Sequence, residues 1–292
     1  MRIMIFGGNG FIGQHLAENL ELNHQVEIFD RKTTPRSGYF GDIKDREAVF
    51  QAMSHCDRWA NLAGVLGTQE LICDAAGAVQ TNILGAVNIF DAATAFQKPG
   101  LQIAVGNYWM SNPYSITRTA SERFALFYNR ERGTDIRVVR AMNVFGEGQA
   151  QRPIRKLVPN LIVNALLDQP ITIYGDGEQI MDLIYVKDAV EILSRALLAD
   201  APNSIVYEAG AGGDVTVNQA LNIVCQLTES LSPVEYLPMR PGEEPNAVVQ
   251  ISTQGWVDLR GYLDYHPSDL TPLAKAMAQT VNWYREHLVE FN

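Results

Sequence analysis

The chain has 292 residues, of which 47% are hydrophobic and 19% are charged, so it can bury a large core and is long for a single domain. Its 23 basic and 33 acidic residues give a formal charge of −10, and no basic block alternates with aromatic residues, which argues against a nucleic-acid partner. No apolar run reaches membrane-spanning length and no charged leader precedes the first strand, so we expect a cytoplasmic protein without a membrane partner. Cys56, Cys73 and Cys225 lack metal-binding spacing, and we expect packing residues and no metal.

The first turn of the chain predicts a nucleotide-binding site. Residues 2–6 form an apolar run typical of a buried strand, and residues 15–20 change to helical spacing. Gly7, Gly10 and Gly13 therefore lie at a strand-to-helix junction. There they would allow the tight turn, the approach of a pyrophosphate and close packing of the helix on the strand, respectively. The alternative is an ordinary tight turn between a strand and a helix.

A second apolar strand, residues 26–30, ends in Asp30 at about the distance expected for a ribose contact. A carboxylate there accepts hydrogen bonds from a ribose 2′-hydroxyl and repels a 2′-phosphate, so Asp30 favours NAD. The adjacent Arg31 and Lys32 would attract a 2′-phosphate, so NADP is the alternative cofactor. Together with the glycine-rich turn, this spacing predicts dinucleotide binding.

Strand-like and helix-like segments alternate from residue 1 to about 140, which predicts an α/β fold with a doubly wound parallel (Rossmann) sheet. We expect residues 1–150 to form the NAD-binding domain. Residues 151–292 would form mainly a smaller α/β substrate-binding domain, with room for strands that return to the sheet. Helices are expected in this part at residues 154–167, 186–198, 217–227 and 270–289, with Asp188 as an N-cap.

Three polar or small-residue positions follow the first strands. Asp42 would meet the adenine edge of the cofactor or, equally, cap a helix over residues 44–53. Residues 61–64 lead from the fourth strand into a small-residue turn against which a cofactor would lie flat. Thr81 and Asn82 interrupt an apolar helical segment, where the simplest expectation is a satisfied internal hydrogen bond.

A tyrosine and an arginine share one helix face after the fifth strand, residues 101–106. Asn112 is a natural N-cap and Pro113 a natural first helical residue, which places Tyr114 in the first turn and Arg118 one turn later. A phenol ordinarily has a pKa near 10, so a tyrosine base needs nearby positive charge, which Arg118, the helix N-terminus and a nicotinamide ring would supply. The alternative is a surface tyrosine packed over a helical arginine.

Across nearly its whole length the chain resembles the extended short-chain dehydrogenase/reductase family, in particular the nucleotide-sugar epimerases and dehydratases. The motifs that carry the resemblance are Gly7–Gly13, Asp30, Gly41–Ile43, Asn61–Gly64, Asn82, Tyr114–Arg118, Arg140–Gly146, Gly175–Gln179, Asp182–Asp188 and Arg240–Gly242. The resemblance implies hydride transfer between NAD and a sugar ring carbon, with Tyr114 as the base and Arg118 in place of the usual lysine. The implied cofactor contacts are Gly7, Asn9, Gly10, Phe11, Ile12, Gly13, Asp30, Arg31, Asp42, Ile43, Leu62, Ala63, Gly64, Asn82, Tyr114 and Arg118.

The chain departs from this family at three places. Arg118 keeps the positive charge of the usual lysine but cannot release a proton. The serine or threonine that usually follows the fifth strand is replaced by a short loop, in which Asn107 or Ser111 would supply the hydrogen bond. Met181 occupies the place of an arginine, so one diphosphate contact is missing.

The implied substrate is a nucleoside-diphosphate sugar, held by Asn143, Lys156, Gln179 and Arg240. An epimerase is the leading hypothesis. Another nucleotide-sugar-modifying enzyme (a decarboxylase, a reductase or, less favoured, a dehydratase) and a non-catalytic NAD-binding sensor or assembly protein are the alternatives. Apolar positions over residues 68–96 and 114–132, including Phe124, Phe127 and Tyr128, predict a homodimer joined by four helices.

Overall fold

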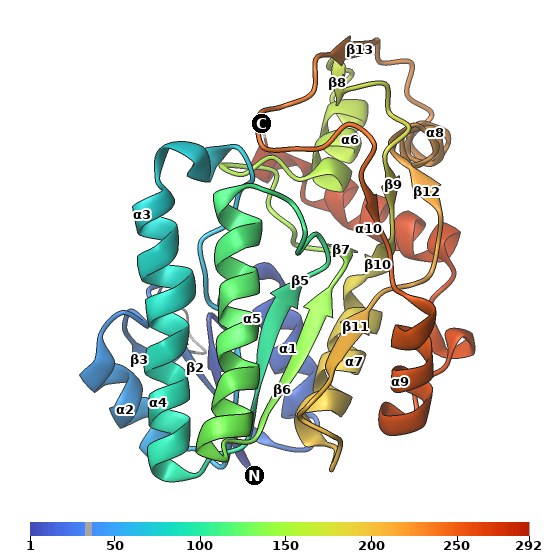
Figure 1. Cartoon of the computed structure of the whole chain (residues 1–292). Coiled ribbons are helices and arrows are strands. Elements are labelled where there is room, and N and C mark those ends of the chain that lie inside the picture. Colours follow the sequence, from blue (N-terminus) through green and yellow to red (C-terminus); the bar gives the residue numbers. More distant parts are fainter. Residues whose placement is uncertain (33–36, 292) are drawn as a thin grey trace.

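The computed structural model describes residues 1–32 and 37–291, and its centre is a seven-stranded parallel sheet (Figure 1). The strand order is β11-β6-β5-β4-β1-β2-β3, and each neighbouring pair is parallel. The strands are β1 (Arg2–Phe6), β2 (Gln25–Asp30), β3 (Ser37–Phe40), β4 (Arg58–Asn61), β5 (Gly100–Val105), β6 (Ile136–Ala141) and β11 (Val206–Ala209). The predicted doubly wound Rossmann sheet is confirmed.

Helices cover both faces of this sheet because its strands are apolar on both sides. In β1 the side chains of Ile3 and Ile5 enter one core, while Met4 and Phe6 enter the other. The first face is packed by α1 (Phe11–Glu21) and α7 (Val186–Leu198), and the second by α2 (Arg46–Ser54), α4 (Ala86–Phe96) and α5 (Pro113–Arg132). In Figure 1, α4 and α5 stand side by side in front of the sheet, next to α3 (Ala75–Ala78).

The C-terminal part adds further helices and three small sheets, most of them above the carboxyl ends of the main strands, while one helix, Thr253–Leu263, lies beside β11 (Figure 1). Its helices are α6 (Leu157–Leu166), α8 (Val217–Thr228), α9 (Thr253–Leu263) and α10 (Leu273–Glu286). Its strands are β7 (Asn143–Phe145), β8 (Ile171–Tyr174), β9 (Ile180–Met181), β10 (Leu183–Tyr185), β12 (Val215–Thr216), β13 (Val234–Leu237) and β14 (Val248–Val249). Short 3₁₀ turns cover Glu70–Cys73 (η1), Pro267–Asp269 (η3) and Leu288–Phe291 (η4). β11 belongs to the main sheet and α7 packs against it, although both follow residue 150. The division near residue 150 therefore stays a prediction about which part binds which ligand.

Three local expectations need correction. Asp188 lies inside the first turn of α7, and its carboxylate accepts hydrogen bonds from the backbone N–H and hydroxyl of Thr271, both at 2.9 Å. The N-cap of α2 is Asp45, which accepts from the Ala48 amide, so Asp42 does not cap this helix. Tyr128 is buried and donates to Asp91 at 2.6 Å, so its ring packs inside the monomer.

The polar interruption at Thr81 and Asn82 coincides with a π-helical segment, η2 (Val79–Gly85), between α3 and α4. The Asn82 side chain accepts from the Val65 amide at 2.9 Å and donates to the Thr117 hydroxyl at 3.0 Å. The π-helical geometry therefore directs the buried side-chain amide of Asn82 toward the loop after β4 and toward α5. The expected internal hydrogen bond is present. Among the described helices, none is both long and apolar enough to cross a membrane.

Candidate active site

A cavity of ≈ 450 Å³ opens at the carboxyl ends of β1, β2 and β4, where ligands of parallel α/β sheets bind. It is lined by fifteen of the predicted cofactor residues: Gly7, Asn9, Gly10, Phe11, Ile12, Gly13, Asp30, Arg31, Asp42, Ile43, Leu62, Ala63, Gly64, Tyr114 and Arg118. Asn82 does not line it, because its amide is turned toward Val65 and Thr117. Thr81 and Gln149 line the cavity although the sequence had not pointed to them.

The glycine-rich turn fits a dinucleotide pyrophosphate. Gly7 has φ +81°, and a Cβ there would lie 2.6 Å from the Ala63 amide nitrogen, so the turn requires glycine. A Cβ at Gly13 would lie 2.5 Å from the Gly7 carbonyl oxygen, whereas one at Gly10 would meet only that oxygen, at 3.3 Å. Gly10 is also the N-cap of α1 and no side chain caps this end, which leaves its first N–H groups available to an anion.

Asp30 lies at the end of β2 on the rim of the cavity. Its carboxylate accepts from the backbone amides of Asn9 and Lys32, both at 3.0 Å, so it joins the glycine-rich turn to the end of β2. Arg31, whose positive charge would favour NADP, lies 3.8 Å from the carboxylate of Asp42. An acidic pair therefore faces the part of the cavity where the resemblance implies the adenosine.

Tyr114 stands between this cavity and a second one. The Asn112 side chain caps α5 by accepting from the Ser115 amide at 2.9 Å, and Pro113 is the first helical residue, as predicted. Tyr114 then lines both the cofactor cavity and a neighbouring cavity of ≈ 340 Å³. A side chain in this position can touch ligands in both.

Arg118 lies one turn further along α5, against the loop after β4. Its side chain is 4% exposed, and Nη1 donates to the Ala63 carbonyl at 3.0 Å. A Cβ at Gly64 would lie 2.8 Å from the guanidinium carbon, so this glycine makes room for the arginine. The Arg118 Nε is buried with no hydrogen-bond partner among the described residues, which leaves one donor beside the cofactor cavity.

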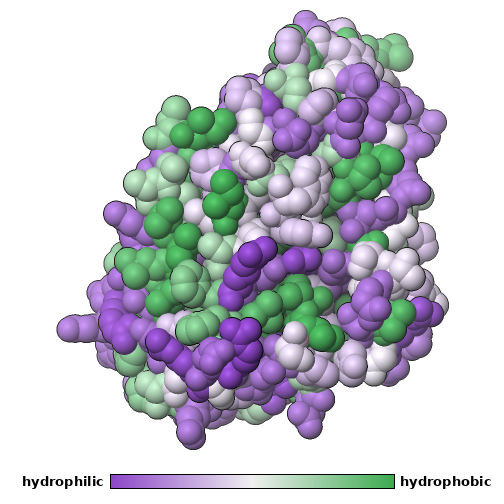
Figure 2. Space-filling view, in the orientation of Figure 1, coloured by the Kyte–Doolittle hydropathy of each residue, from purple (hydrophilic) through white to green (hydrophobic). Residues whose placement is uncertain are grey.

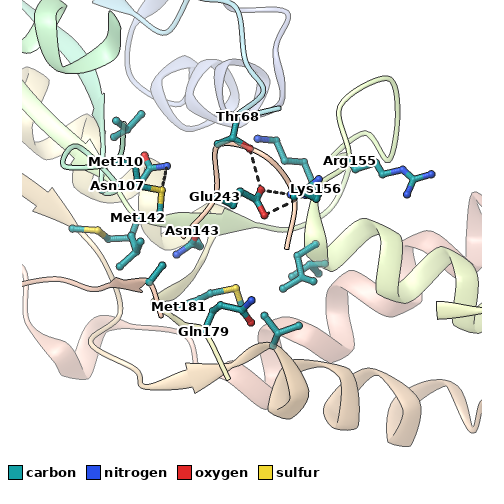
Figure 3. Close-up of a pocket in the computed structure, with 18 of the residues that line it drawn as sticks. Thr68, Asn107, Met110, Met142, Asn143, Arg155, Lys156, Gln179, Met181 and Glu243 are labelled. Carbon is teal, nitrogen blue, oxygen red and sulfur yellow. Dashed lines mark hydrogen bonds and ion pairs between the residues drawn. The ribbon is translucent and has the colours of Figure 1, made fainter. Parts of the chain in front are cut away.

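All four predicted substrate residues line the second cavity: Asn143, Lys156, Gln179 and Arg240. The Asn143 Nδ2 and the Gln179 Oε1 are buried without a hydrogen-bond partner in the described residues. Arg240 forms an ion pair with Glu243, and Glu243 also accepts from the Thr68 hydroxyl at 3.0 Å (Figure 3). Glu243 was not among the predicted site residues, and the contact that joins it to the cavity wall comes from Thr68, 175 positions away.

The short loop after β5 brings Asn107, but not Ser111, to this cavity. Asn107 lines it and donates from Nδ2 to the Met110 sulfur at 3.5 Å. Ser111 is exposed and lines neither of the two cavities. Met181, in the place of an expected arginine, lines the cavity as well, so this position contributes surface without charge.

A loop between β7 and α6 borders both cavities through Gln149 and is held by Glu147. The Glu147 carboxylate accepts from the Tyr185 hydroxyl at 2.5 Å and the Lys187 ammonium at 3.2 Å, and its carbonyl contacts the His15 ring at 2.9 Å. Burial alone would raise the pKa of Glu147, but these hydrogen bonds and the Lys187 charge outweigh burial and lower it. Glu147 therefore stays ionised and anchors the loop to both α1 and α7.

In residues 1–32 and 37–291, no cluster of three or more His, Cys, Asp or Glu side chains is placed to hold a metal ion. A Rossmann sheet with a fitted glycine-rich turn and an adjoining second cavity defines a dinucleotide-binding protein with room for a second ligand. The model of the NAD dependent epimerase/dehydratase family matches residues 3–106 and 100–210. The chain belongs to this family, whose cofactor is NAD.

Similar proteins carry out several reactions. The UDP-N-acetyl-alpha-D-glucosaminuronate decarboxylase of Bacillus cytotoxicus is 25% identical over 98% of this chain and 98% of its own. A dTDP-glucose 4,6-dehydratase of Haemophilus influenzae is 24% identical, over 97% of this chain and 98% of its own. The solved UDP-glucose 4-epimerase of Thermotoga maritima superposes with a TM-score of 0.90 at 23% identity, covering 99% of this chain and 100% of that one. These likenesses support the fold and the family and leave the particular reaction open.

We expect NAD to bind at least about tenfold more tightly than NADP, because the Asp30 carboxylate would repel a 2′-phosphate. Asp30→Ala should lose most of this preference, as measured by fluorescence titration of both cofactors. Asp30→Asn is the closest matched control, since it removes the charge and keeps the side-chain shape and one of the two acceptor oxygens that the Asn9 and Lys32 amides use. Equal affinity of the wild type for both cofactors would contradict the prediction and point to Arg31 or Lys32.

Proposed function

We propose that the protein is an NAD-dependent nucleoside-diphosphate-sugar epimerase that acts by transient oxidation of a sugar hydroxyl. The observation that supports this most is the position of Tyr114, whose side chain lines both the cofactor cavity and the second cavity. A sugar in the second cavity would meet a proton acceptor at the wall that it shares with the cofactor. Epimerisation needs only this one acid/base group, used in both directions.

Bound NAD would supply reversible hydride transfer to and from a sugar ring carbon. Tyr114 would take the hydroxyl proton as the C–H hydride leaves, and would return that proton when the ring, turned to its other face, is reduced. Arg118 is buried beside the cofactor cavity one helical turn after Tyr114, where it would supply a fixed positive charge. Asn107 would hydrogen-bond the sugar in place of the usual serine or threonine.

A dehydratase needs a further acid and base to eliminate water, and the loop from Asn107 to Asn112 contains no carboxylate. A decarboxylase has the support of the Bacillus cytotoxicus relative, and a net reductase would use the same tyrosine. The alternative outside the enzymes is a sensor or assembly protein that binds NAD without catalysing a reaction. It would hold NAD without reducing it when a panel of nucleotide sugars is added to the purified protein, whereas the enzyme would show reduced cofactor or sugar turnover.

Tyr114→Phe should lower turnover by about 10²- to 10⁴-fold, because a positioned acid/base group contributes about that factor. The ring remains, so the fold and the NAD affinity should stay near wild type. The measurement is the steady-state rate with the nucleotide sugar found to be active, combined with a fluorescence titration of NAD. Full activity in this variant would remove Tyr114 from the mechanism.

Arg118→Met should weaken NAD binding and turnover together, because the variant loses both the Ala63 hydrogen bond and the charge beside Tyr114. Arg118→Lys is the matched control, since it keeps the charge and restores the residue usual in the family. We expect the lysine variant to retain much of the activity. If Arg118→Met matched the wild type in both NAD affinity and rate, Arg118 would have only a packing role.

We further propose a homodimer that pairs two segments with their copies across a two-fold axis: residues 68–96, which include η2 and α4, and residues 114–132 of α5. Figure 2 shows hydrophobic side chains gathered over the side of the molecule where Figure 1 places α3, α4 and α5. The exposed members are Val79, Leu84, Ile116, Phe124 and Phe127, with exposures from 40% at Phe124 to 56% at Ile116. A patch of this kind marks an interaction surface more often than isolated exposed residues do.

Light scattering at micromolar concentration should give twice the monomer mass of 32.4 kDa. Phe124→Asp should shift the protein toward the monomer, because it places a charge in the centre of the proposed four-helix contact. Leu22→Asp, at another exposed apolar residue just after α1, should leave the mass unchanged. A monomeric wild type would reject the dimer.

A further inference from the structure

The loop after β5 turns at residues 106–109 and sends two neighbouring side chains to different places. Asn107 lines the substrate cavity, where Figure 3 shows it beside Met110 and Asn143. Tyr108 lines neither of the two cavities and lies instead against Arg140, whose guanidinium carbon is 3.7 Å from the centre of the tyrosine ring. This is the shortest cation–ring distance in the part of the chain that the structure describes. Because one planar peptide joins the two residues, a restraint on the Tyr108 ring also restrains the backbone that carries Asn107.

Arg140 offers the ring a fixed surface. Its Nε and Nη2 donate to the two carboxylate oxygens of Glu122, at 2.8 Å and 2.7 Å, and its Nη1 lies 3.7 Å from the Glu208 carboxylate. A bidentate pair of this kind fixes the plane of the guanidinium, and a planar guanidinium stacks well on an aromatic face. Glu122 is 3% exposed and belongs to α5, about two turns after Tyr114. The Tyr108 ring is therefore stacked on a cation that is itself tied to the helix of the proposed base.

The other contacts of this loop leave the direction of the Asn107 side chain to the backbone. The Thr119 hydroxyl donates to the Tyr108 carbonyl, and the Met110 amide donates to the Asn107 carbonyl, each at 3.1 Å. The Asn107 side chain itself donates only to the Met110 sulfur, 3.5 Å away, among the described residues. A thioether is a weak acceptor, so this contact does little to hold the amide in place.

We propose that Tyr108 is a positioning residue for the reaction: stacked on Arg140, it holds the loop after β5 so that the Asn107 amide faces the sugar. This inference rests on the proposed function, in which Asn107 takes the place of the usual serine or threonine. A group that acts on a reacting ring must be held to within about 0.5 Å. The stacked tyrosine supplies that restraint from outside the cavity.

Tyr108→Ala should lower kcat by about 10- to 100-fold and leave the NAD affinity near wild type, because it releases Asn107 without removing a residue from either cavity. Tyr108→Phe keeps the stacked ring and should keep most of the wild-type rate. Both are measured as steady-state rates with the active nucleotide sugar, with NAD affinity determined by fluorescence titration. A wild-type rate in Tyr108→Ala, or a Phe variant as slow as the Ala variant, would overturn the proposal.

Trp109→Ala is the matched control on the same loop. The Trp109 ring is 45% exposed, against 43% for Tyr108, but it has no cation or aromatic partner in residues 1–32 and 37–291. Its removal should therefore leave kcat near wild type. A loss as large as that of Tyr108→Ala would overturn the proposal, because the stacking on Arg140 would then not be what matters.

A double-mutant cycle with Asn107 separates positioning from a general effect on the protein. In the Asn107→Ala background, Tyr108→Ala should slow turnover by less than about threefold further, because the group that it positions is already absent. A double variant in which the two losses multiply in full would overturn the proposal, since Tyr108 would then act independently of Asn107. An Asn107→Ala variant with the wild-type rate would overturn it as well.

Hydrogen exchange tests the loop without a substrate. The peptide that covers residues 106–112 includes the Met110 amide, which is bonded to the Asn107 carbonyl. In Tyr108→Ala this peptide should exchange at least about tenfold faster than in the wild type and in Tyr108→Phe. Unchanged exchange in Tyr108→Ala overturns the proposal and leaves the proposed function standing. A wild type that turns over no nucleotide sugar fails the proposed function, and the proposal fails with it.

Discussion

The two hydrogen bonds of the buried Asn112 side chain fix how the two cavities meet. Its oxygen accepts from the Ser115 amide and so sets the first turn of α5, while its nitrogen donates to the Gly242 carbonyl at 2.9 Å. The helix that carries Tyr114 and the loop that carries Arg240 are thereby positioned by one amide. Gly242 has φ +82°, and a Cβ there would lie 3.1 Å from the Thr68 carbonyl oxygen, so the loop can cross at this point because the residue is glycine.

The parts of the site that the sequence predicted depend on neighbouring residues. The start of α5 is encoded by two adjacent residues, the N-cap Asn112 and the first helical residue Pro113. Similarly, α7 occupies residues 186–198, the range that its sequence pattern predicted. In the turn from Gly7 to Gly13, the positive φ of Gly7 and the close contact of Gly13 with the Gly7 carbonyl are also local, although Gly7 makes a further close contact with Ala63. Local chemistry of this kind can be recognised in a single sequence because no distant residue has to be known.

The parts that the sequence did not predict depend on partners far along the chain. An internal hydrogen bond was expected at Asn82, but its partners Val65 and Thr117, 17 and 35 positions away, could not be named from the sequence. Asp188 is of a residue type that often caps helices, but its carboxylate accepts a hydrogen bond from Thr271, 83 positions later. Arg155 is engaged by Tyr174, 19 positions away. The ion pair of Arg240 with Glu243 is local in the sequence, but Glu243 is also held by Thr68, 175 positions away. Charge balance in a cavity is a property of the tertiary structure.

The residues around position 118 accommodate the guanidinium group of an arginine. A guanidinium is larger than the ammonium of lysine and planar, and here it lies where Gly64 leaves space and where the Ala63 carbonyl accepts from Nη1. The arginine thus ties α5 to the loop after β4 more rigidly than a flexible lysine would, and keeps a fixed positive charge beside the cofactor cavity. Since it cannot give up a proton, the proton that Tyr114 takes from a sugar has no exit through this residue. A site without a proton route through this residue suits the proposed epimerisation, in which Tyr114 would return the proton to the same substrate.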